Sequence, residues 1–116
     1  LSLLYSRCQV VIVPGEEEFC LTALEAQGSG KPVIAYAQSG VAEIILPGKT
    51  GLLFNSQTTQ SLEQAVGRFS MMKFDEDLCR KQAQKFSFAN FKSQFLKEIE
   101  KIRINYYQRL NHLVTL

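Results

Sequence analysis

Two glutamates, Glu17 and Glu25, have carboxylate side chains and a spacing along the chain that suit the binding of a ligand. They lie on either side of the start of a predicted helix, in a segment that follows the apolar run at 10–13. The free N–H groups and the dipole at a helix start favour an anion there, typically a phosphate. Acidic residues just before a helix also act as ordinary stabilisers of its first turn, and the spacing alone favours neither interpretation.

The spacing argues against a pair of carboxylates that would hydrolyse a glycosidic bond. On one helix, at ~1.5 Å of rise per residue, the two glutamates would lie ~12 Å apart. The carboxylates of a glycoside hydrolase lie roughly 5 to 9.5 Å apart. Carboxylates on both sides of a helix start can instead accept hydrogen bonds from hydroxyl groups at two ends of a ligand whose phosphates sit between them.

The elements that would position these glutamates are short strands that alternate with helices. Apolar runs predict strands at 10–13, 33–36 and 51–54, and helical patterns predict helices at 21–27 and 41–46. The run at 10–13 is continuous and β-branched, so we expect a strand buried on both faces. The β-α-β-α-β order predicts an α/β fold, a three-layer α/β/α Rossmann-like parallel sheet with right-handed crossovers. Ligands bind outside the carboxyl ends of such strands, and the segment that contains the glutamates follows the carboxyl end of the strand at 10–13.

The second half of the chain predicts three helices, each with a side-chain cap. Thr58 or Thr59 would cap the first, Asp75 the second and Ser87 the third. The third helix carries an apolar stripe that we expect to pack against the sheet domain: Phe91, Phe95, Ile99, Ile102 and Tyr106. In a fragment, the apolar residues of 106–116 are expected to be uncovered and to drive self-association through this C-terminal helix.

Length and composition limit the classes of protein that the sequence encodes. The 116 residues suffice for one small domain, with a β/α portion over about 1–55 and a helical portion over 56–116. A net charge of +2, with basic residues scattered among acidic ones, argues against a nucleic-acid partner. No apolar run approaches the ~20 residues that span a bilayer, so we expect no transmembrane segment.

The cysteines indicate the compartment. Cys8, Cys20 and Cys79 have no CxxC spacing and are odd in number, which argues against a disulfide framework and against a zinc site. A reduced, cytoplasmic location fits this pattern. We expect Cys8 and Cys79 to be buried small apolar groups, Lys31 to be a solvated turn lysine and His112 to be a plain surface residue.

Two features indicate a piece of a longer protein. The chain starts at Leu1 without a methionine, inside a predicted helix. Three strands are also few for a doubly wound domain, which usually has roughly five or six. We expect the missing strands to precede Leu1.

Four blocks, in order along about residues 5 to 100, resemble a known family. They comprise Glu17, Phe19, Glu25 and Ala26, then Gly30–Ala35, Ser39–Glu43 and Gly48–Leu53. The pattern resembles that of the family-four, group 1 retaining glycosyltransferases with the GT-B fold: two glutamates separated by seven residues, then GKPVIA, GGxxE and GxTGLL. The resemblance implies the C-terminal part of such an enzyme, which binds the nucleotide-sugar donor.

The resemblance also implies roles for the matched positions. Glu17, the catalytic position, would bind hydroxyls of the donor sugar, and Glu25 would bind the ribose hydroxyls of the nucleotide. The backbone N–H groups of Phe19, Cys20 and Leu21 would face the sugar and the diphosphate and stabilise charge on the leaving group. The donor would be UDP- or GDP-linked, with no metal or other cofactor, and the other partner would be the missing N-terminal domain. A location at the inner face of the membrane is compatible with this role.

Departures from the family pattern concern glycines. Glu18 and Cys20 stand where the family has glycines on each side of Phe19, and the glycine pair appears as Ser39 and Gly40. Because glycine lets a backbone approach a ligand closely, a side chain at position 20 is expected to narrow or redirect the sugar pocket.

Some assignments stay open. The acidic run at 16–18 leaves the register uncertain by one residue, although the seven-residue spacing favours Glu17. Glu43 fits either a ligand contact across a cleft or a carboxylate at a helix start. The acidic context before Phe19 resembles that of bacterial mannosyltransferases that use GDP-mannose.

Two functions from different classes remain. The first is the donor-binding domain of a retaining glycosyltransferase that moves a hexose from a nucleoside diphosphate to a hydroxyl, inactive as an isolated fragment because its acceptor domain and the basic pair for the diphosphate lie upstream. The second is a decayed glycosyltransferase-like domain that serves as a binding or interaction module, which Cys20 and the missing half motivate. A flavodoxin-like nucleotide-binding domain fits the element order but not the four blocks.

Overall fold

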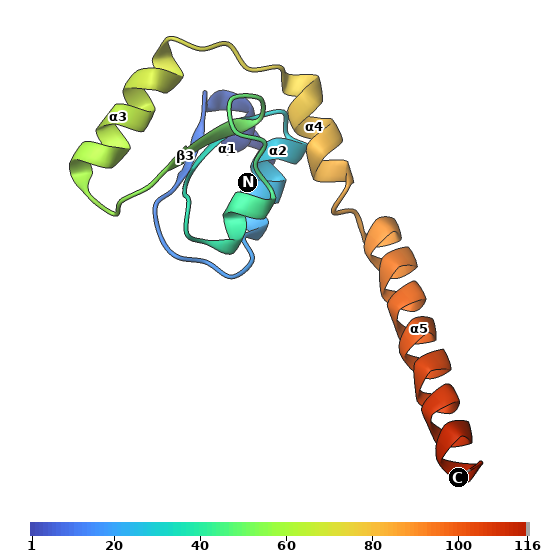
Figure 1. Cartoon of the computed structure of the whole chain (residues 1–116). Coiled ribbons are helices and arrows are strands. Elements are labelled where there is room, and N and C mark those ends of the chain that lie inside the picture. Colours follow the sequence, from blue (N-terminus) through green and yellow to red (C-terminus); the bar gives the residue numbers. More distant parts are fainter. Residues whose placement is uncertain (116) are drawn as a thin grey trace. The chain divides into compact units, whose positions relative to one another are not determined.

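The structure is a computed structural model that describes residues 1–115 and divides into two units, Leu1–Lys85 and Phe86–Leu116. The first unit contains, in order, α1 (Ser2–Arg7), β1 (Val11–Val13), α2 (Leu21–Gly28), β2 (Val33–Tyr36), the 3-10 helix η1 (Gly40–Glu43), β3 (Gly51–Phe54), α3 (Thr59–Ser70) and α4 (Glu76–Gln84). The second unit contains α5 (Phe88–Val114) (Figure 1).

The three strands form one parallel sheet in the order β1-β2-β3. Val11 pairs with Val33, and Val33 pairs with Gly51, so the carboxyl ends of all three strands meet at one edge. β2 is the central strand, and all four of its residues are buried. The predicted α/β parallel sheet is therefore confirmed, and its carboxyl edge is the place where a ligand site is expected.

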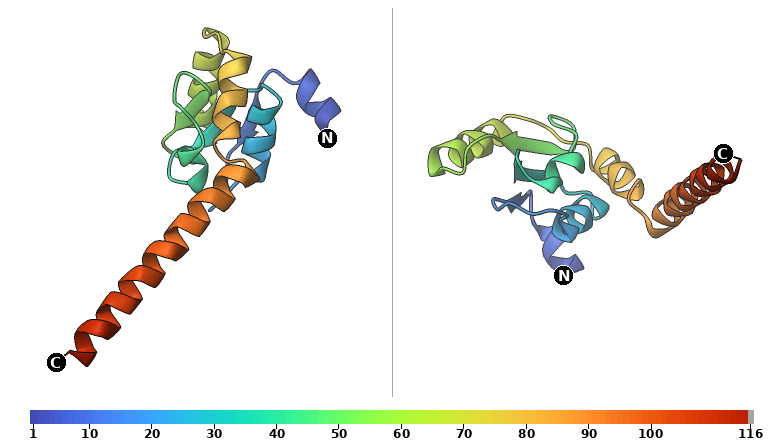
Figure 2. Two further views of the ribbon diagram at one scale, coloured as in Figure 1. Left: turned by 90° about the vertical axis from the view of Figure 1, so that its right-hand side faces the viewer. Right: turned by 60° about the horizontal axis from the view of Figure 1, so that its bottom comes forward.

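Helices cover the sheet in layers. Leu52 and Phe54 of β3 form a core cluster with Ile34 and Tyr36 of β2 and with Ala65 of α3. α2 packs against β1 and β2 and buries Ala23 and Ala26, and α4 packs against α2 (Figures 1 and 2). The α/β/α arrangement predicted from the element order is thus confirmed.

The predicted burial of the first strand on both faces is wrong. Val13 is buried, but Ile12 is 41% exposed. β1 is an edge strand with one strand neighbour, and α3 packs on β3 at the other side of the sheet. A continuous apolar run in the sequence does not reveal which strand will be at the edge.

The predicted helix at 41–46 is also wrong. Only Gly40–Glu43 form a short 3-10 helix, and the chain then enters a turn. In that turn the N–H of Lys49 donates to the carbonyl of Leu46 at 2.9 Å, and Gly48 has φ +76. Proline at position 47 and a positive φ at position 48 are the features of a type II turn, which stops the helix early.

A buried polar network holds this turn against α2. Thr50 is fully buried, and its Oγ1 accepts hydrogen bonds from the N–H of Leu46 at 2.9 Å and from Nε2 of Gln27 at 3.1 Å. The Nε2 of Gln82, in α4, donates to the carbonyl of Ile44 at 2.9 Å. The threonine of the GxTGLL block therefore has a structural role, since it satisfies buried donors.

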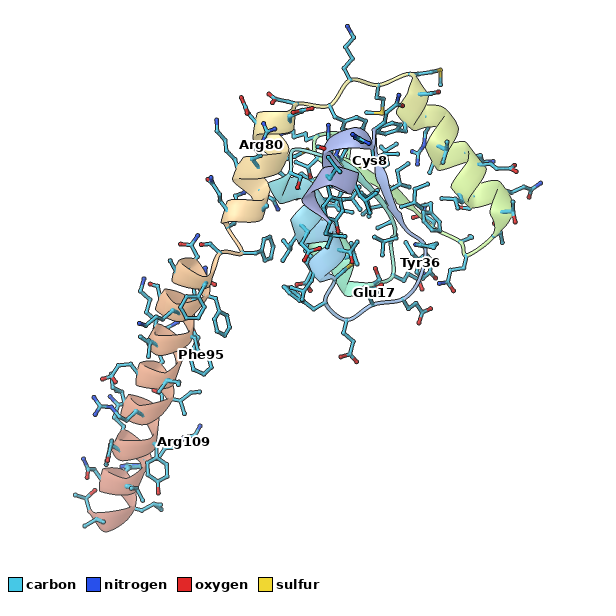
Figure 3. All side chains as sticks on the ribbon, turned by 180° about the vertical axis from the view of Figure 1, so that it is seen from behind. Cys8, Glu17, Tyr36, Arg80, Phe95 and Arg109 are labelled. Carbon is cyan, nitrogen blue, oxygen red and sulfur yellow. The ribbon has the colours of Figure 1, made fainter. Side chains whose placement is uncertain are left out.

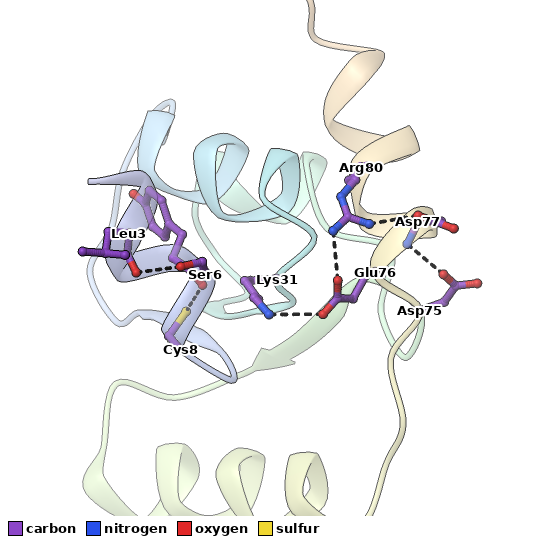
Figure 4. Close-up of polar contacts among 9 residues, drawn as sticks. Leu3, Ser6, Cys8, Lys31, Asp75, Glu76, Asp77 and Arg80 are labelled. Carbon is purple, nitrogen blue, oxygen red and sulfur yellow. Dashed lines mark hydrogen bonds and ion pairs between the residues drawn. The ribbon is translucent and has the colours of Figure 1, made fainter.

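Lys31 is not the solvated turn lysine that the sequence predicts. Its side chain is 15% exposed, and its Nζ lies 3.1 Å from Oε1 of Glu76 at the start of α4 (Figure 4). The other Glu76 oxygen lies 2.9 Å from Arg80, which also pairs with Asp77. Lys31 and then Arg80 lower the pKa of Glu76. The Lys31–Glu76 pair ties α4 to the segment just before β2, and the two Arg80 pairs lie within α4.

The helix caps of the second half are confirmed. Thr58, Asp75 and Ser87 each accept a hydrogen bond from backbone N–H groups of the helix that follows. Each oxygen satisfies a donor that the first turn of a helix leaves free.

α5, described as a unit by itself, buries none of its residues. All five members of the predicted stripe are exposed, from 46% at Ile99 to 67% at Ile102. Within this unit, Phe91 and Phe95 stack on each other with ring centroids 5.5 Å apart, and the packing of the stripe against the sheet domain stays a prediction. His112 is exposed, as predicted.

Candidate functional site

The predicted site lies in the segment that joins β1 to α2, at the carboxyl edge of the sheet. A loop over 14–20 joins the two elements, and Glu17 on this loop is exposed. Figure 3 labels Glu17 on the loop after β1 and Tyr36 at the end of β2. Parallel pairing of β1 and β2 puts both strand ends at the same edge. The fold thus brings the glutamate to the position where open α/β sheets bind ligands.

The start of α2 offers free backbone donors. Cys20 is the N-cap residue in an extended conformation and makes no side-chain cap hydrogen bond. Within the described residues, the N–H groups of Phe19, Cys20 and Leu21 donate no hydrogen bond. Phe19 and Leu21 are 57% and 64% exposed, whereas Cys20 between them is 1% exposed.

The alternative interpretation, in which acidic residues just before a helix stabilise its first turn, stays open for α2. The first turn of α2 contains no acidic residue. Glu16, Glu17 and Glu18 all precede the N-cap, and all three are exposed. Their carboxylates therefore flank the helix start from the loop.

Cys20 does not present its side chain to the solvent side of the site. The residue is 1% exposed, and burial and then the neighbouring Glu17 carboxylate raise the pKa of its thiol. The thiol is thus neutral and turned inward, close to Glu17. The effect of this side chain on the sugar pocket stays a prediction, and Cys20 can face a ligand only through its backbone.

Glu25 lies one turn into α2 and has a partner that sequence reasoning missed. The phenol of Tyr5, in α1, donates a hydrogen bond of 2.9 Å to Oε2 of Glu25. Tyr5 is 8% exposed, and burial together with this contact raises the pKa of the phenol. Glu25 itself is exposed, so its other oxygen stays available to a ligand hydroxyl. A lone tyrosine in a short helix gives no signal in the sequence.

Gly40, at the start of η1, is a second residue whose role the sequence did not reveal. Its N–H donates to the carbonyl oxygen of Glu17 at 2.7 Å. The hydroxyl of the preceding Ser39 donates to the carbonyl of Tyr36 at 2.9 Å. The loop after β1 and the segment after β2 are therefore joined by backbone contacts. Glu43, at the end of η1, is exposed.

A shallow hollow of about 240 Å³ lies at the same edge of the sheet, beside the start of α3. It is lined by Pro14, Phe54, Gln57, Thr58, Thr59 and Leu62. Nε2 of Gln57 donates to the carbonyl of Pro14 at 3.3 Å, which closes one wall. None of the five predicted site residues lines this hollow.

The described residues also bear on metal binding and on membrane insertion. Over residues 1–115, no three His, Cys, Asp or Glu side chains gather as a metal site would require. In the same part of the chain, no helix combines the length and the apolar character needed to cross a bilayer. All three cysteines are unpaired.

Comparisons with known proteins point to one family. Residues 1–86 match the family model described as "Glycosyl transferases group 1". The D-inositol 3-phosphate glycosyltransferase of Corynebacterium aurimucosum is 39% identical over 98 residues, which are 77% of this chain and 22% of that protein. The lipopolysaccharide 1,2-N-acetylglucosaminetransferase of Salmonella typhimurium is 30% identical over 83% of this chain and 27% of its own length.

Solved structures agree with the sequence relatives. Sucrose-phosphate synthase from Thermosynechococcus elongatus superposes with a TM-score of 0.64 and 29% identity, over 91% of this chain and 27% of that one. Anabaena HepE in complex with UDP shares the fold, with a TM-score of 0.67 and 22% identity over 84% of this chain and 29% of that one. The chain thus spans about a quarter of the length of these relatives. Because the family model covers most of the chain, this protein belongs to the group 1 glycosyl transferases.

Proposed function

We propose that this chain is the donor-binding part of a retaining glycosyltransferase that transfers a hexose from a nucleoside diphosphate to a hydroxyl acceptor. One observation carries the proposal: the start of α2 has free N–H groups, with the exposed Glu17 on the loop before it and the exposed Glu25 one turn into the helix. The family membership and the UDP complex of the structural relative support it.

Each group has a distinct task in this proposal. Glu17 accepts hydrogen bonds from hydroxyls of the donor sugar, and Glu25, oriented by Tyr5, accepts them from the ribose. The N–H groups of Phe19, Cys20 and Leu21 face the diphosphate. As the bond to the sugar breaks, negative charge grows on the diphosphate, and preorganised donors with the helix dipole stabilise it.

The donor is UDP- or GDP-linked in this proposal, and its binding needs no metal. A GDP-mannose-dependent α-mannosyltransferase of Mycolicibacterium smegmatis is 43% identical over 47% of this chain, which supports the GDP alternative. The acceptor site belongs to an N-terminal domain, and residues 1–116 form one partial domain that is inactive alone. We also propose a cytoplasmic location, peripheral to the inner face of the membrane.

The departures at positions 18 and 20 favour a retained site over a decayed one. Among residues 1–115, no residue other than glycine has a positive φ. Cys20 has φ −111, a conformation that any residue adopts, so its side chain causes no backbone strain. Cys20 is buried, so its side chain does not project into the solvent beside the helix start. The second candidate, a binding module without nucleotide affinity, would be favoured only by a failure of the titration below.

Calorimetric titration of the 116-residue chain with UDP, GDP, UDP-glucose and GDP-mannose, in buffer with EDTA, tests the proposal. We expect at least one nucleotide to bind and Glu25→Ala to abolish that binding. Glu17→Ala should weaken binding of the nucleotide sugar more than binding of the free nucleotide. Glu16→Ala is the matched control, because this neighbouring carboxylate lies outside the seven-residue spacing. Absence of binding by every nucleotide would contradict the proposal.

A further inference from the structure

We propose that Gly40 positions the donor loop, and that the site tolerates no side chain at this residue. The inference rests on the proposed function, since it names the residue that fixes Glu17 and the start of α2 for the donor. It concerns the second member of the glycine pair in the GGxxE block, where this chain has Ser39 and Gly40.

The contact at Gly40 is made by backbone atoms. A Cβ placed on Gly40 would lie 1.7 Å from the carbonyl oxygen of Glu18, 2.6 Å from its carbonyl carbon and 3.1 Å from the carbonyl oxygen of Glu17. Distances under about 3 Å between such atoms do not persist, and a peptide group cannot rotate aside like the end of a long side chain. The φ of Gly40 is not positive, so space and not backbone conformation requires glycine here.

The neighbouring residue shows how local this requirement is. Ser39 has φ −136 and ψ 161, an extended conformation, and its hydroxyl donates to the carbonyl of Tyr36 at 2.9 Å. A side chain at position 39 is therefore accommodated and bonded. The departure from the family's glycine pair falls on the position that the fold leaves free, and glycine is kept where the loop makes contact.

A side chain at position 40 would displace the loop more readily than η1. Val41 and Ile44 are fully or almost fully buried, and the carbonyl of Ile44 accepts a hydrogen bond from the buried Gln82. The loop residues Glu17 and Glu18, in contrast, are exposed. The buried segment that follows Gly40 is therefore held more firmly than the exposed loop that contacts it.

Displacement of the loop would disturb both parts of the proposed site. The carbonyl oxygen of Glu17 accepts the 2.7 Å hydrogen bond from the N–H of Gly40, and this bond ties the loop to η1. Phe19, Cys20 and Leu21, which follow Glu18, carry the N–H groups proposed to face the diphosphate. A shift of about 1 Å in such groups can weaken binding or catalysis by as much as two orders of magnitude.

The test compares Gly40→Ala with three controls in the 116-residue chain. Gly67→Ala adds a Cβ in α3 with nothing within 4 Å. Ser39→Gly restores the family's pair without adding a clash. Gly51→Ala places a Cβ 2.0 Å from the carbonyl oxygen of Val33, in the sheet, and so reproduces a backbone clash away from the loop. For each variant, calorimetry gives the affinity for the nucleotide that the unaltered chain binds, and NMR gives the amide shifts of residues 17–21.

We expect Gly40→Ala to weaken nucleotide binding roughly 10- to 100-fold and to shift the amide signals of 17–21 without ligand. Gly67→Ala and Ser39→Gly should bind within about twofold of the unaltered chain, as uncoupled surface changes do. Gly51→Ala should lower the melting temperature and, at temperatures where it is folded, keep the amide signals of 17–21. Unchanged affinity and unchanged shifts in Gly40→Ala would overturn the inference, as would equal effects in Gly51→Ala.

A measurement on the unaltered chain covers the case in which Gly40→Ala fails to fold. The Gly40 amide should exchange its hydrogen slowly because the carbonyl of Glu17 accepts it. Exchange at the rate of a free amide would overturn the inference. If the unaltered chain binds no nucleotide, the proposed function fails, and the amide shifts and exchange still decide whether Gly40 holds the loop.

Discussion

The phenol of Tyr5 donates a 2.9 Å hydrogen bond to Oε2 of Glu25 and so links α1 to α2. The two residues are 20 positions apart, and the contact fixes one oxygen of the carboxylate that we propose for the ribose. A ligand hydroxyl can then use the other oxygen without first ordering the side chain, which lowers the entropic cost of binding.

Tyr5→Phe should therefore weaken nucleotide binding by a modest factor. A hydrogen bond of this kind contributes about 0.5–1.5 kcal/mol net, which corresponds to roughly a two- to tenfold loss of affinity. Calorimetry on Tyr5→Phe, Glu25→Gln and the double variant measures the coupling between the two residues. Additive effects of the two changes would contradict a positioning role for Tyr5.

Stability should fall at alkaline pH. Burial, in each case the largest cause, raises the pKa of the Tyr5 phenol above 10.0 and of the Cys20 and Cys79 thiols above 9.0. The folded state therefore favours the protonated forms. Their contribution is complete below these ordinary values and is lost as pH rises through the higher folded-state pKa values. Urea unfolding between pH 7 and pH 11 should show this decline.

Cys79→Ala supplies the control for that pH profile. This variant lacks one of the three groups, so its stability should be lower at pH 7 and should decline less steeply above pH 9. A free energy of unfolding that stays constant from pH 8 to pH 11 in the unaltered chain would contradict the role of these buried groups.

Thr50→Val should destabilise the first unit. The change keeps the shape of the side chain but removes the oxygen that accepts from Leu46 and Gln27. The part-buried N–H of Leu46 loses this acceptor, and the buried Nε2 of Gln27 keeps only the 3.5 Å contact with the Thr50 carbonyl. Such a loss costs about 1–3 kcal/mol per group. Urea denaturation gives the free energy of unfolding, and Thr59→Val is the control because Thr59 is exposed. Equal stability of the two variants would show that the network is unimportant.

The exposed apolar stripe of α5 should cause the chain to self-associate. Ile102 belongs to the stripe and is 67% exposed, whereas Ile104 is 47% exposed and points to the opposite side of the helix. Ile102→Asn should shift sedimentation toward the monomer, and the matched change Ile104→Asn should have little effect. A monomeric unaltered chain at all concentrations would refute self-association through this helix.

Local interactions were the part of the structure that could be predicted from the sequence. The strands at 33–36 and 51–54, the helix that starts at Leu21 and the caps Thr58, Asp75 and Ser87 all depend on residues close together in the chain. Neighbouring residues set backbone propensity and capping, so a pattern of types and spacings suffices. The four family blocks were recognisable for the same reason, because they are contiguous segments.

Only the tertiary structure decided which distant groups meet. Lys31 pairs with Glu76 across 45 positions, Tyr5 bonds to Glu25, and Gly40 rests against Glu18. The sequence treated these residues one at a time, and it did not reveal that the thiol of Cys20 is buried. Contacts of this kind depend on how crossovers place one element on another, and that placement results from burial of the whole core rather than from any local pattern.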